Sequence, residues 1–405
     1  MAWIQVPCTL EKYPGAPEGH FFLGDNAVCD LSAWEGQVQC VYMDPPFMTG
    51  ESFVYRGRVG EKGWADGTGQ FTLDAFSDKL DKASYLDMLR GALLAAKKLL
   101  KETGALLLHV DPRASAYARL LCDEIFGERN FVNEIIWAYQ TGGRSTKHFS
   151  RKHDTVLFYR MTGALYFDIA SVPLPRTGNR QNHMRRNVDE NGRSYRTIVS
   201  NGKTYTYYDD APVYPGDVWN DVSHLQQKDP QRTGYDTQKP VALLERIIRS
   251  TTRPGDIVAD LFCGSGTTLA AAAKLDRRYL GVDIGKCAAA VTARRLCNTG
   301  LRVHMSSGCP DAVLNAEVSG GIGLSDISLV SYSAPGLPEG TEGTDAVERW
   351  AAGFLDGDRF TAHAVCARSR HEPALPVSLQ VPQLSGRLCI LVGDCFGRTS
   401  CWVET

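Results

Sequence analysis

Apolar runs and polar stretches alternate along the first 300 residues in a pattern typical of an α/β protein. Short apolar runs predict strands at 38–43, 105–110, 132–139, 154–159 and 279–282, and a further strand begins at Ile257. Apolar residues repeating about every 3.6 positions predict helices at 84–100, 116–126, 241–250, 269–274 and 286–298. Strands that alternate with helices in this way predict an open, mostly parallel sheet with helices on both faces.

The apolar run Val38–Met43 ends abruptly at Asp44, Pro45, Pro46 and Phe47. Consecutive prolines fix φ and lack N–H donors, so the strand stops and the chain turns rigidly. The corner then offers a carboxylate, an unused main-chain carbonyl and an aromatic ring, a combination that suits a planar amine. Asp-Pro-Pro is also a turn signal in any protein, so the corner alone does not decide a function.

A second distinctive stretch, Asp260–Thr267, follows the strand that begins at Ile257 and leads into a helix of small residues. Its glycines allow a tight turn and close backbone approach to a ligand, and the helix N-terminus favours an anionic group. The next strand ends in Asp283, an acid placed to hold ribose hydroxyls. The unit predicts a nucleoside-cofactor site, without the Gly-x-Gly-x-x-Gly spacing of dinucleotide binding.

Together the two stretches resemble the beta class of DNA amino-methyltransferases, the N-4/N-6 DNA methylase family that includes the type III modification subunits. In that family a D-P-P-Y/F motif precedes an F-x-G-x-G motif that binds S-adenosylmethionine (SAM). The resemblance covers about Phe21 to Thr299. It implies a circularly permuted, SAM-dependent methyltransferase (Rossmann-like) doubly wound sheet, with the strands that end at Asp44 and Asp260 side by side.

The resemblance also implies which residues bind SAM. A Gly-Asp pair at Asp25 lines the adenine pocket in the family, although here it can equally be a polar turn cap. Thr237 and Lys239 match a motif beside the methionine moiety, where helix capping is the alternative. The implied cofactor contacts are Asp25, Thr237, Lys239, Asp260, Phe262, Gly264, Ser265, Gly266, Thr267 and Asp283.

The implied reaction is methylation of the exocyclic N6 amine of an adenine flipped out of duplex DNA. The implied catalytic residues are Asp44, Pro45, Pro46 and Phe47, in which two oxygens accept the amine hydrogens and the ring stacks on the base. An acid at the first motif position favours adenine in the family, whereas serine is commoner for cytosine N4. Cytosine-N4 methylation, methylation of a protein or RNA amine, and a specificity subunit that has lost SAM are the alternatives.

DNA contact requires a local basic region, because the formal net charge of the chain is only −2. Residues 140–203 hold 12 lysines and arginines against four acids, and such a stretch can position a protein on phosphates. The candidate DNA-binding residues are Arg144, Lys147, Arg151, Lys152, Arg185 and Arg186. Alternating residues around Asn201-Gly202 predict a hairpin. The insertion that contains this hairpin resembles the target-recognition region of the family.

Two segments beside the motifs remain open. His109, at the end of the strand 105–110, is more often a structural neighbour of such a site than a catalytic group. Residues 48–70 have loop composition and are expected to form a mobile lid.

The predicted organisation is a catalytic half (1–160), a target-recognition insertion (161–235), a SAM-binding half (236–305) and a small accessory or oligomer-contact module (311–405). The first 20 residues of the catalytic half are expected to be an unpatterned lead. The last segment holds 12 acids, six arginines and no lysine, so its surface is expected to repel DNA.

Twelve cysteines without Cys-x-x-Cys pairs indicate reduced thiols and no metal. Without a signal peptide or membrane span, the expected location is the cytoplasm. Double-stranded DNA is the expected partner, and a restriction subunit and a second copy of the chain are candidates.

Overall fold

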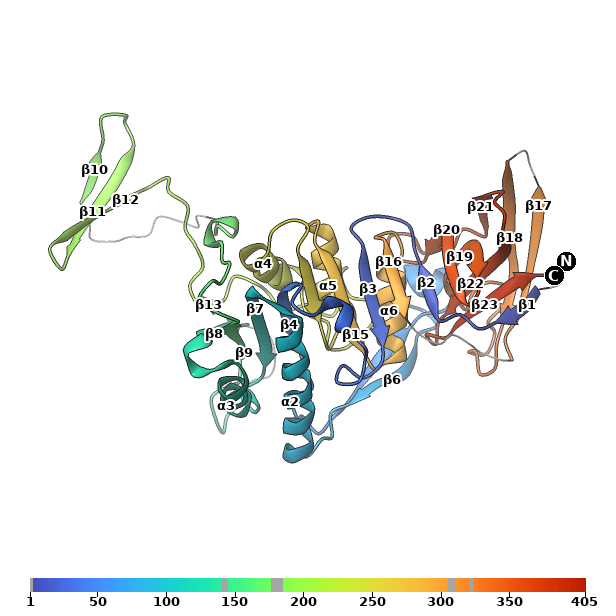
Figure 1. The fold of residues 1–405 in the computed structure, drawn as a ribbon, viewed down its shortest axis with the longest axis horizontal. Coiled ribbons are helices and arrows are strands. Elements are labelled where there is room, and N and C mark those ends of the chain that lie inside the picture. Colours follow the sequence, from blue (N-terminus) through green and yellow to red (C-terminus); the bar gives the residue numbers. More distant parts are fainter. Residues whose placement is uncertain (1–2, 140–144, 176–184, 305–310, 321–322) are drawn as a thin grey trace.

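The computed structural model describes residues 3–139, 145–175, 185–304, 311–320 and 323–405. Its central layer is an open sheet whose core strands are parallel, flanked by antiparallel strands at one edge (Figure 1). The order across this part of the sheet is β16 (Leu301–His304), β3 (Gly19–Leu23), β15 (Arg278–Asp283), β14 (Ile257–Asp260), β4 (Val38–Met43), β7 (Leu100–Val110), β9 (His153–Arg160), β8 (Phe131–Ala138) and β13 (Val218–Trp219). The predicted α/β class and mostly parallel sheet are confirmed.

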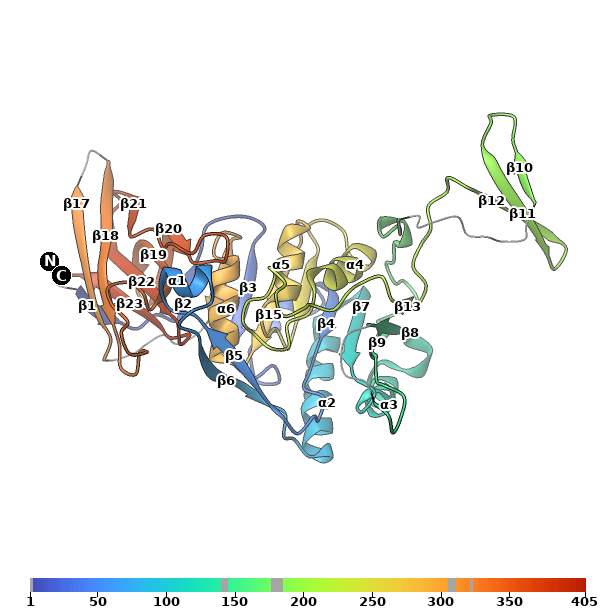
Figure 2. The ribbon, with the colours of Figure 1, turned by 180° about the vertical axis from the view of Figure 1, so that it is seen from behind.

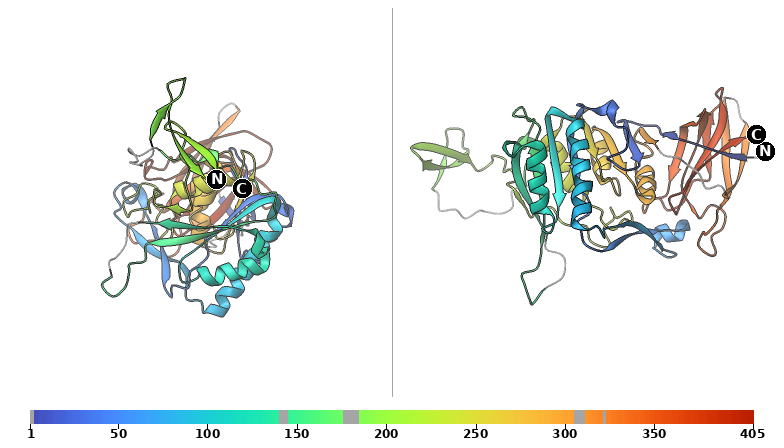
Figure 3. Two further views of the ribbon diagram at one scale, coloured as in Figure 1. Left: turned by 90° about the vertical axis from the view of Figure 1, so that its left-hand side faces the viewer. Right: turned by 60° about the horizontal axis from the view of Figure 1, so that its bottom comes forward.

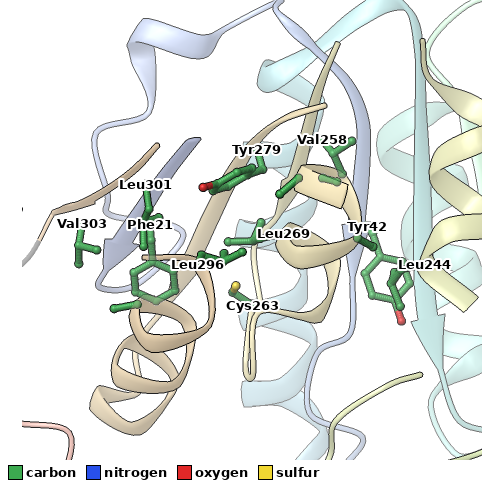
Figure 4. Packing of buried hydrophobic residues seen from close by; sticks show 14 of the residues in the cluster. Phe21, Tyr42, Leu244, Val258, Cys263, Leu269, Tyr279, Leu296, Leu301 and Val303 are labelled. Carbon is green, nitrogen blue, oxygen red and sulfur yellow. The ribbon is translucent and has the colours of Figure 1, made fainter. Parts of the chain in front are cut away.

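Helices cover both faces of this sheet and create two hydrophobic cores. The helices are α2 (Lys82–Leu99) and α3 (Ser115–Phe126) on one face, and α4 (Val241–Thr251), α5 (Thr267–Lys274) and α6 (Lys286–Leu296) on the other. Successive side chains of a strand point to opposite faces, so Tyr42 of β4 enters the core of α4 to α6 while Met43 enters the other. Figure 4 shows Phe21, Leu269 and Leu296 packed in the first of these cores.

The two motif-bearing strands are neighbours. β4 and β14 pair in parallel, with Val41 opposite Ala259 and Tyr42 opposite Asp260. Because the strands are parallel, both motifs leave the sheet at the same edge. The adjacency that the resemblance implied is therefore confirmed.

Residues 48–70 do not form the predicted loop. β5 (Ser52–Gly57) pairs with β6 (Phe71–Ser77) in an antiparallel hairpin, with the short helix α1 (Gly60–Ala65) between them. Tyr55 is buried in this hairpin, and Phe53 stacks on Phe76. The prediction was wrong because glycines that cap the strands and the helix gave the segment the composition of a loop.

The predicted hairpin around Asn201-Gly202 is confirmed. β10 (Arg186–Val188), β11 (Ser194–Ser200) and β12 (Lys203–Tyr208) form an antiparallel sheet, and both turn residues have positive φ. None of the residues in these strands is buried. The small sheet projects away from the rest of the molecule (Figures 1 and 3).

The C-terminal residues fold into two packed layers of strands. One layer contains β19 (Val347–Asp356), β20 (Arg359–Ala367), β22 (Arg387–Asp394) and β23 (Thr399–Glu404); the other contains β17 (Val313–Gly320), β18 (Leu324–Ser333) and β21 (Ser378–Pro382). Trp350 and Trp402 lie in the core between them.

The first twelve residues are not an unpatterned lead. β1 (Trp3–Val6) pairs with β23, and β2 (Leu10–Lys12) joins β20 to β16. Strand pairing therefore connects the N-terminus to the C-terminal strands, although the predicted catalytic half, 1–160, includes it. Within the described ranges, three short 3₁₀ helices complete the fold: Ser32–Trp34, Glu128–Asn130 and Ile169–Ser171.

Candidate active site

A cavity of about 390 Å³ lies at the carboxyl ends of β4, β14 and β15. We call it the strand-end cavity. Its lining residues come from the Asp-Pro-Pro corner, the glycine loop and the segment before α4; those predicted from the sequence are Asp44, Pro46, Thr237, Lys239, Asp260, Phe262, Gly264, Ser265, Thr267 and Asp283. Apolar side chains, among them Leu80, Met88 and Ile284, complete the wall. Most of the predicted cofactor residues are thus brought together.

The glycine loop holds a conformation that larger residues would disturb. Gly264 and Gly266 have φ values of +50° and +71°, and a Cβ on Gly266 would lie 2.6 Å from Thr292 Oγ1. The amide of Gly264 donates to Asp283 Oδ2 at 2.7 Å, and Gly285 donates to Oδ1 at 2.7 Å. Burial raises the pKa of Asp283, and the two amides partly offset the shift. Asp283 therefore holds the loop in place at the cavity wall.

Asp260 is buried and both of its oxygens are used. Oδ1 accepts the amide of Phe262 at 3.0 Å, and Oδ2 accepts the hydroxyl of Thr268. The pKa of Asp260 is raised to about 7: burial raises it most, the hydrogen bonds to Thr268 and Phe262 lower it, and the nearby charges of Asp44 and Asp283 add to the rise.

Asp44 is bonded differently, although its strand is adjacent. Its Oδ2 pairs with Lys239 Nζ, while Oδ1 is buried and has no hydrogen-bond partner among the described residues. Lys239 Nζ also lies 5.4 Å from the centroid of the Phe47 ring. A buried acceptor without a donor is energetically unfavourable, so this oxygen is suited to a donor from a bound molecule.

The turn after the prolines is fixed by Asp78, which the sequence reasoning missed. The amides of Phe47 and Thr49 donate to Asp78 Oδ2 at 3.0 Å, and that of Met48 donates to Oδ1 at 2.9 Å. Asp78 is buried directly after β6. The β5–β6 hairpin therefore places the ring of Phe47.

A second cavity, of about 370 Å³, meets the first. Its aromatic wall consists of Phe47, Phe53, Trp137, Tyr139 and His224. We call it the aromatic cavity. It shares Thr237 and Lys239 with the strand-end cavity, so the Asp44–Lys239 pair stands at the junction of the two.

Residues 38–294 match the family model whose description is DNA methylase, of the N6 and N4 class. The chain belongs to this DNA methylase family. The resemblance stated from the motifs is therefore confirmed.

Curated relatives of this DNA methylase include the type II methyltransferase M.EcaI of Enterobacter cloacae. It is 25% identical over 324 residues, which cover 68% of each chain. The DNA adenine methyltransferase YhdJ of Escherichia coli K12 is 25% identical over 260 residues, 64% of this chain and 76% of that protein. Among solved structures, the cytosine-N4-specific PvuII DNA methyltransferase aligns with a TM-score of 0.46 at 16% identity, covering 70% of this chain and 89% of that one. The complex of M1.HpyAVI with SAM aligns at 0.41 and 19%, covering 68% and 98%.

His109 of the DNA methylase lies behind the aromatic cavity. It is fully buried, with Nδ1 2.9 Å from Tyr42 Oη and Nε2 3.1 Å from Asp154 Oδ2. Its ring is stacked 6.1 Å from that of Phe47. His109 is not among the residues that line the cavity, and it contacts the ring of Phe47 from behind.

Asp154 is a second carboxylate at the aromatic cavity, and the sequence reasoning assigned it no role. Tyr139 donates to its Oδ1 at 3.2 Å. Burial raises the pKa of Asp154, but the hydrogen bonds and charges of His109, with Lys239 and Tyr139, outweigh burial, and the pKa lies below its usual value. One signal was available, since Asp154 is an isolated acid in a basic stretch and begins a buried strand.

Three predicted residues, Asp25, Pro45 and Gly266, are not among the described residues that line the strand-end cavity. Asp25 is exposed, accepts the amide of Ala27 at 2.8 Å and is not among the described residues that line the strand-end cavity. Its contact with the adenine of SAM stays a prediction. Pro45 is buried inside the corner, and Gly266 lies behind the cavity wall with its φ of +71°.

The candidate DNA-binding residues divide between two places. Arg151 lines the aromatic cavity, and Lys147 and Lys152 lie in the same loop. Arg186 begins β10 of the projecting sheet, where it pairs with Asp209 at 3.0 Å, and Arg185 directly precedes this strand. Arg144 lies outside the described residues.

Across the described ranges, no group of three or more His, Cys, Asp or Glu side chains is placed to hold a metal ion. None of the described helices is long and apolar enough to span a membrane.

Proposed function

We propose that this DNA methylase is a site-specific enzyme that transfers the methyl group of SAM to the exocyclic N6 amine of an adenine flipped out of duplex DNA. The observation that carries the proposal is Asp44 Oδ1, a buried acceptor without a described donor, at the junction of two cavities. One cavity has the features of a cofactor site, and the other has the features of a site for a planar base.

The strand-end cavity fits SAM by the chemistry of its wall. Backbone turns at Gly264 and Gly266 allow close approach, and Leu80, Met88 and Ile284 offer apolar surface to an adenine ring. SAM, when bound, supplies a methyl group activated by the positive sulfonium. Contacts of the ten predicted residues with SAM are part of this proposal.

The aromatic cavity would receive the flipped base. Extrusion from the stack requires a few kcal/mol. Stacking on the ring of Phe47 would offset about 1–3 kcal/mol of this. Asp78 and His109 keep the ring in place, the first through the backbone of the turn and the second by ring contact.

The amine of the base then points to the corner. Asp44 Oδ1 and the carbonyl of Pro45 accept its two hydrogens, which turns the nitrogen lone pair toward the strand-end cavity. The cation of Lys239 keeps Asp44 oriented through Oδ2. Positioning and fixed charge at this junction supply the rate increase.

Adenine is proposed over cytosine because Asp44, an acid, occupies the first motif position. The relative YhdJ of Escherichia coli K12 is a DNA adenine methyltransferase, which is consistent with this choice. Cytosine-N4 methylation would use the same corner and is the second candidate.

The proposal extends to partners and location. Lys147, Arg151 and Lys152 would contact DNA phosphates beside the aromatic cavity, and the projecting sheet with Arg185 and Arg186 would read the target sequence. A restriction subunit is a candidate partner, since the HindVI Mod subunit of Haemophilus influenzae is 22% identical over 66% of this chain and 49% of its own length. A second copy of the chain is the other candidate. The cytoplasm is the proposed location, since the described cysteines are all free thiols.

The deciding experiment measures transfer of labelled methyl from SAM to mixed-sequence duplex DNA, followed by digestion to nucleosides. The expected product is N6-methyladenine, formed by the wild type and absent with Asp44→Ala. Label in N4-methylcytosine would overturn the choice of base. Label in neither, with SAM bound, would contradict DNA as the substrate.

A further inference from the structure

Arginines gather in a cavity of about 390 Å³ on the side of α6 that faces the C-terminal strands. We call it the arginine cleft. Its arginines come from three places in the chain: Arg232 before α4, Arg294 and Arg295 in α6, and Arg368 and Arg370 after β20. The single carboxylate among its lining residues is Glu372. Figure 2 shows α1 and α6 beside β20, the strand that precedes Arg368 and Arg370.

Most of these cations have no carboxylate partner. Arg294 pairs with Glu348 at 2.8 Å, but the other four make no ion pair within 4.0 Å among the described residues. Arg370, for example, donates only to the carbonyl of Asp229 at 3.1 Å. Burial lowers the pKa of Arg295 to about 10. Arg232 and Arg368 donate to several backbone carbonyls, and nearby carboxylates act on Arg368. Arg370 makes the fewest hydrogen bonds of the group, so the cleft keeps a partly buried excess of positive charge, which favours an anion.

The position of these arginines runs against the charge of the surrounding segment. Residues 311–405 hold 12 acids and six arginines, yet two of the six line this cleft. The face that carries these arginines is therefore less acidic than the composition of the segment indicates.

The cleft is connected to the aromatic cavity by one short segment. His224 lines the aromatic cavity, and Gln231 lines the arginine cleft. Seven residues span at most about 25 Å. One DNA strand advances about 3.4 Å per phosphate along the helix axis, so the two sites lie within roughly seven nucleotides.

We propose that the arginine cleft binds a backbone phosphate of the same DNA duplex whose base enters the aromatic cavity. The inference rests on the proposed function, because it takes DNA as the substrate. It assigns residues 311–405 a part in DNA binding. Guanidinium groups suit phosphate because their planar N–H donors can bind two of its oxygens.

Arg370→Gln is the informative variant. Arg295 is unsuitable, because its Nη1 donates to Ser265 O at 3.0 Å and to Thr267 Oγ1 at 3.1 Å in the cofactor loop. Arg370 is half-buried and outside that loop. Loss of one phosphate contact should weaken duplex binding about 3–10-fold at moderate salt and reduce the slope of log K against log [salt] by about 0.9. Fluorescence anisotropy with labelled duplex measures both.

Two matched variants make the test decisive. Arg387→Gln removes an exposed arginine of the same module away from the cleft and should leave the slope unchanged. Arg370→Lys keeps the charge and should retain the slope. Equal slopes for Arg370→Gln and Arg387→Gln would overturn the proposal.

Two further measurements distinguish a DNA contact from binding of a free phosphate compound and from failure of the proposed function. Calorimetric binding of pyrophosphate by wild type but not by Arg370→Gln, with DNA binding unchanged, would assign the cleft to a free phosphate compound and overturn the DNA contact. At limiting DNA, Arg370→Gln should transfer methyl about 3–10-fold more slowly than Arg387→Gln, and equal rates would overturn the proposal. Absence of transfer by the wild type would instead contradict the proposed function.

Discussion

Asp44 and Asp260 follow adjacent parallel strands of one sheet, yet their surroundings differ. Asp260 is 2% exposed, and its oxygens accept a backbone amide and a hydroxyl from its own loop. Asp44 Oδ2 accepts a hydrogen bond from Lys239, whereas Oδ1 is buried and has no donor among the described residues. The partner of Asp260 is at most eight residues away, whereas the partner of Asp44 is 195 residues away.

The difference separates a structural carboxylate from one suited to chemistry. When both oxygens are bonded inside the protein, the carboxylate fixes the loop that it belongs to. When one buried oxygen is left over, a ligand can complete its hydrogen bonding and gain the energy that the protein has not used. On this basis we assign the shape of the glycine loop to Asp260 and the orientation of the amine to Asp44.

Replacement of Asp44 by asparagine should have the largest effect on activity. Asp44→Asn keeps the size of the side chain but removes the charge that Lys239 holds and one acceptor for the amine. We expect the single-turnover rate of methyl transfer to fall about 10²–10³-fold, as for loss of other groups that stabilise transition-state charge. SAM affinity, measured by calorimetry, should stay within about threefold. A rate within fivefold of wild type would remove the distinction between the two carboxylates.

Loss of the aromatic ring at position 47 should have an intermediate effect. Phe47→Leu removes the surface on which the base stacks, a contribution of about 1–3 kcal/mol. We expect kcat/KM for DNA to fall between about 5- and 150-fold. Phe47→Tyr, which keeps the ring, is the matched control and should lie near wild type. Equal activity of the leucine and tyrosine variants would argue against stacking.

Replacement of Asp260 should have the smallest effect on activity and a clear effect on stability. Asparagine can accept the Phe262 amide and donate to the Thr268 hydroxyl, so kcat should change less than about tenfold.

The stability effect of Asp260→Asn should depend on pH. The folded-state pKa of Asp260 is raised to about 7, so its favourable contribution is complete below the unfolded pKa and is lost as pH rises through 7. From pH 5 to pH 8 the wild type should therefore lose about 2–4 kcal/mol more stability than Asp260→Asn. Urea unfolding at the two pH values measures this difference, and parallel losses would show that Asp260 does not ionise in this range.

The sequence predicted the parts of the site that depend on neighbours in the chain. β14 and β15 are short, mainly apolar strands that end in an acid, and β4 is followed directly by one; the turn at Asn201-Gly202 needs only its own two residues. The motifs implied the adjacency of β4 and β14, although more than 200 residues separate the strands.

What the sequence could not predict depends on contacts between distant segments. The Lys239–Asp44 pair, the network from Tyr42 through His109 to Asp154, and the capping of the corner by Asp78 arise only when the elements pack. The pairing of β1 with β23 joins the two ends of the chain, and neither strand has a pattern that names its partner. The strand β5 and the helix α1 within residues 48–70 were not predicted, because the glycines of this segment give it the composition of a loop.

The most direct test of the central claim is a double-mutant cycle between Asp44 and the amine of the target base. Once the methylated position is mapped, binding of duplexes with adenine or purine there is compared for the wild type and Asp44→Ala. If Asp44 accepts an amine hydrogen, Asp44→Ala and the purine duplex should each weaken binding. The two changes together should weaken binding little more than either change alone, which gives a coupling free energy of at least about 1 kcal/mol. A coupling near zero would contradict the contact and, with it, the assignment of Asp44.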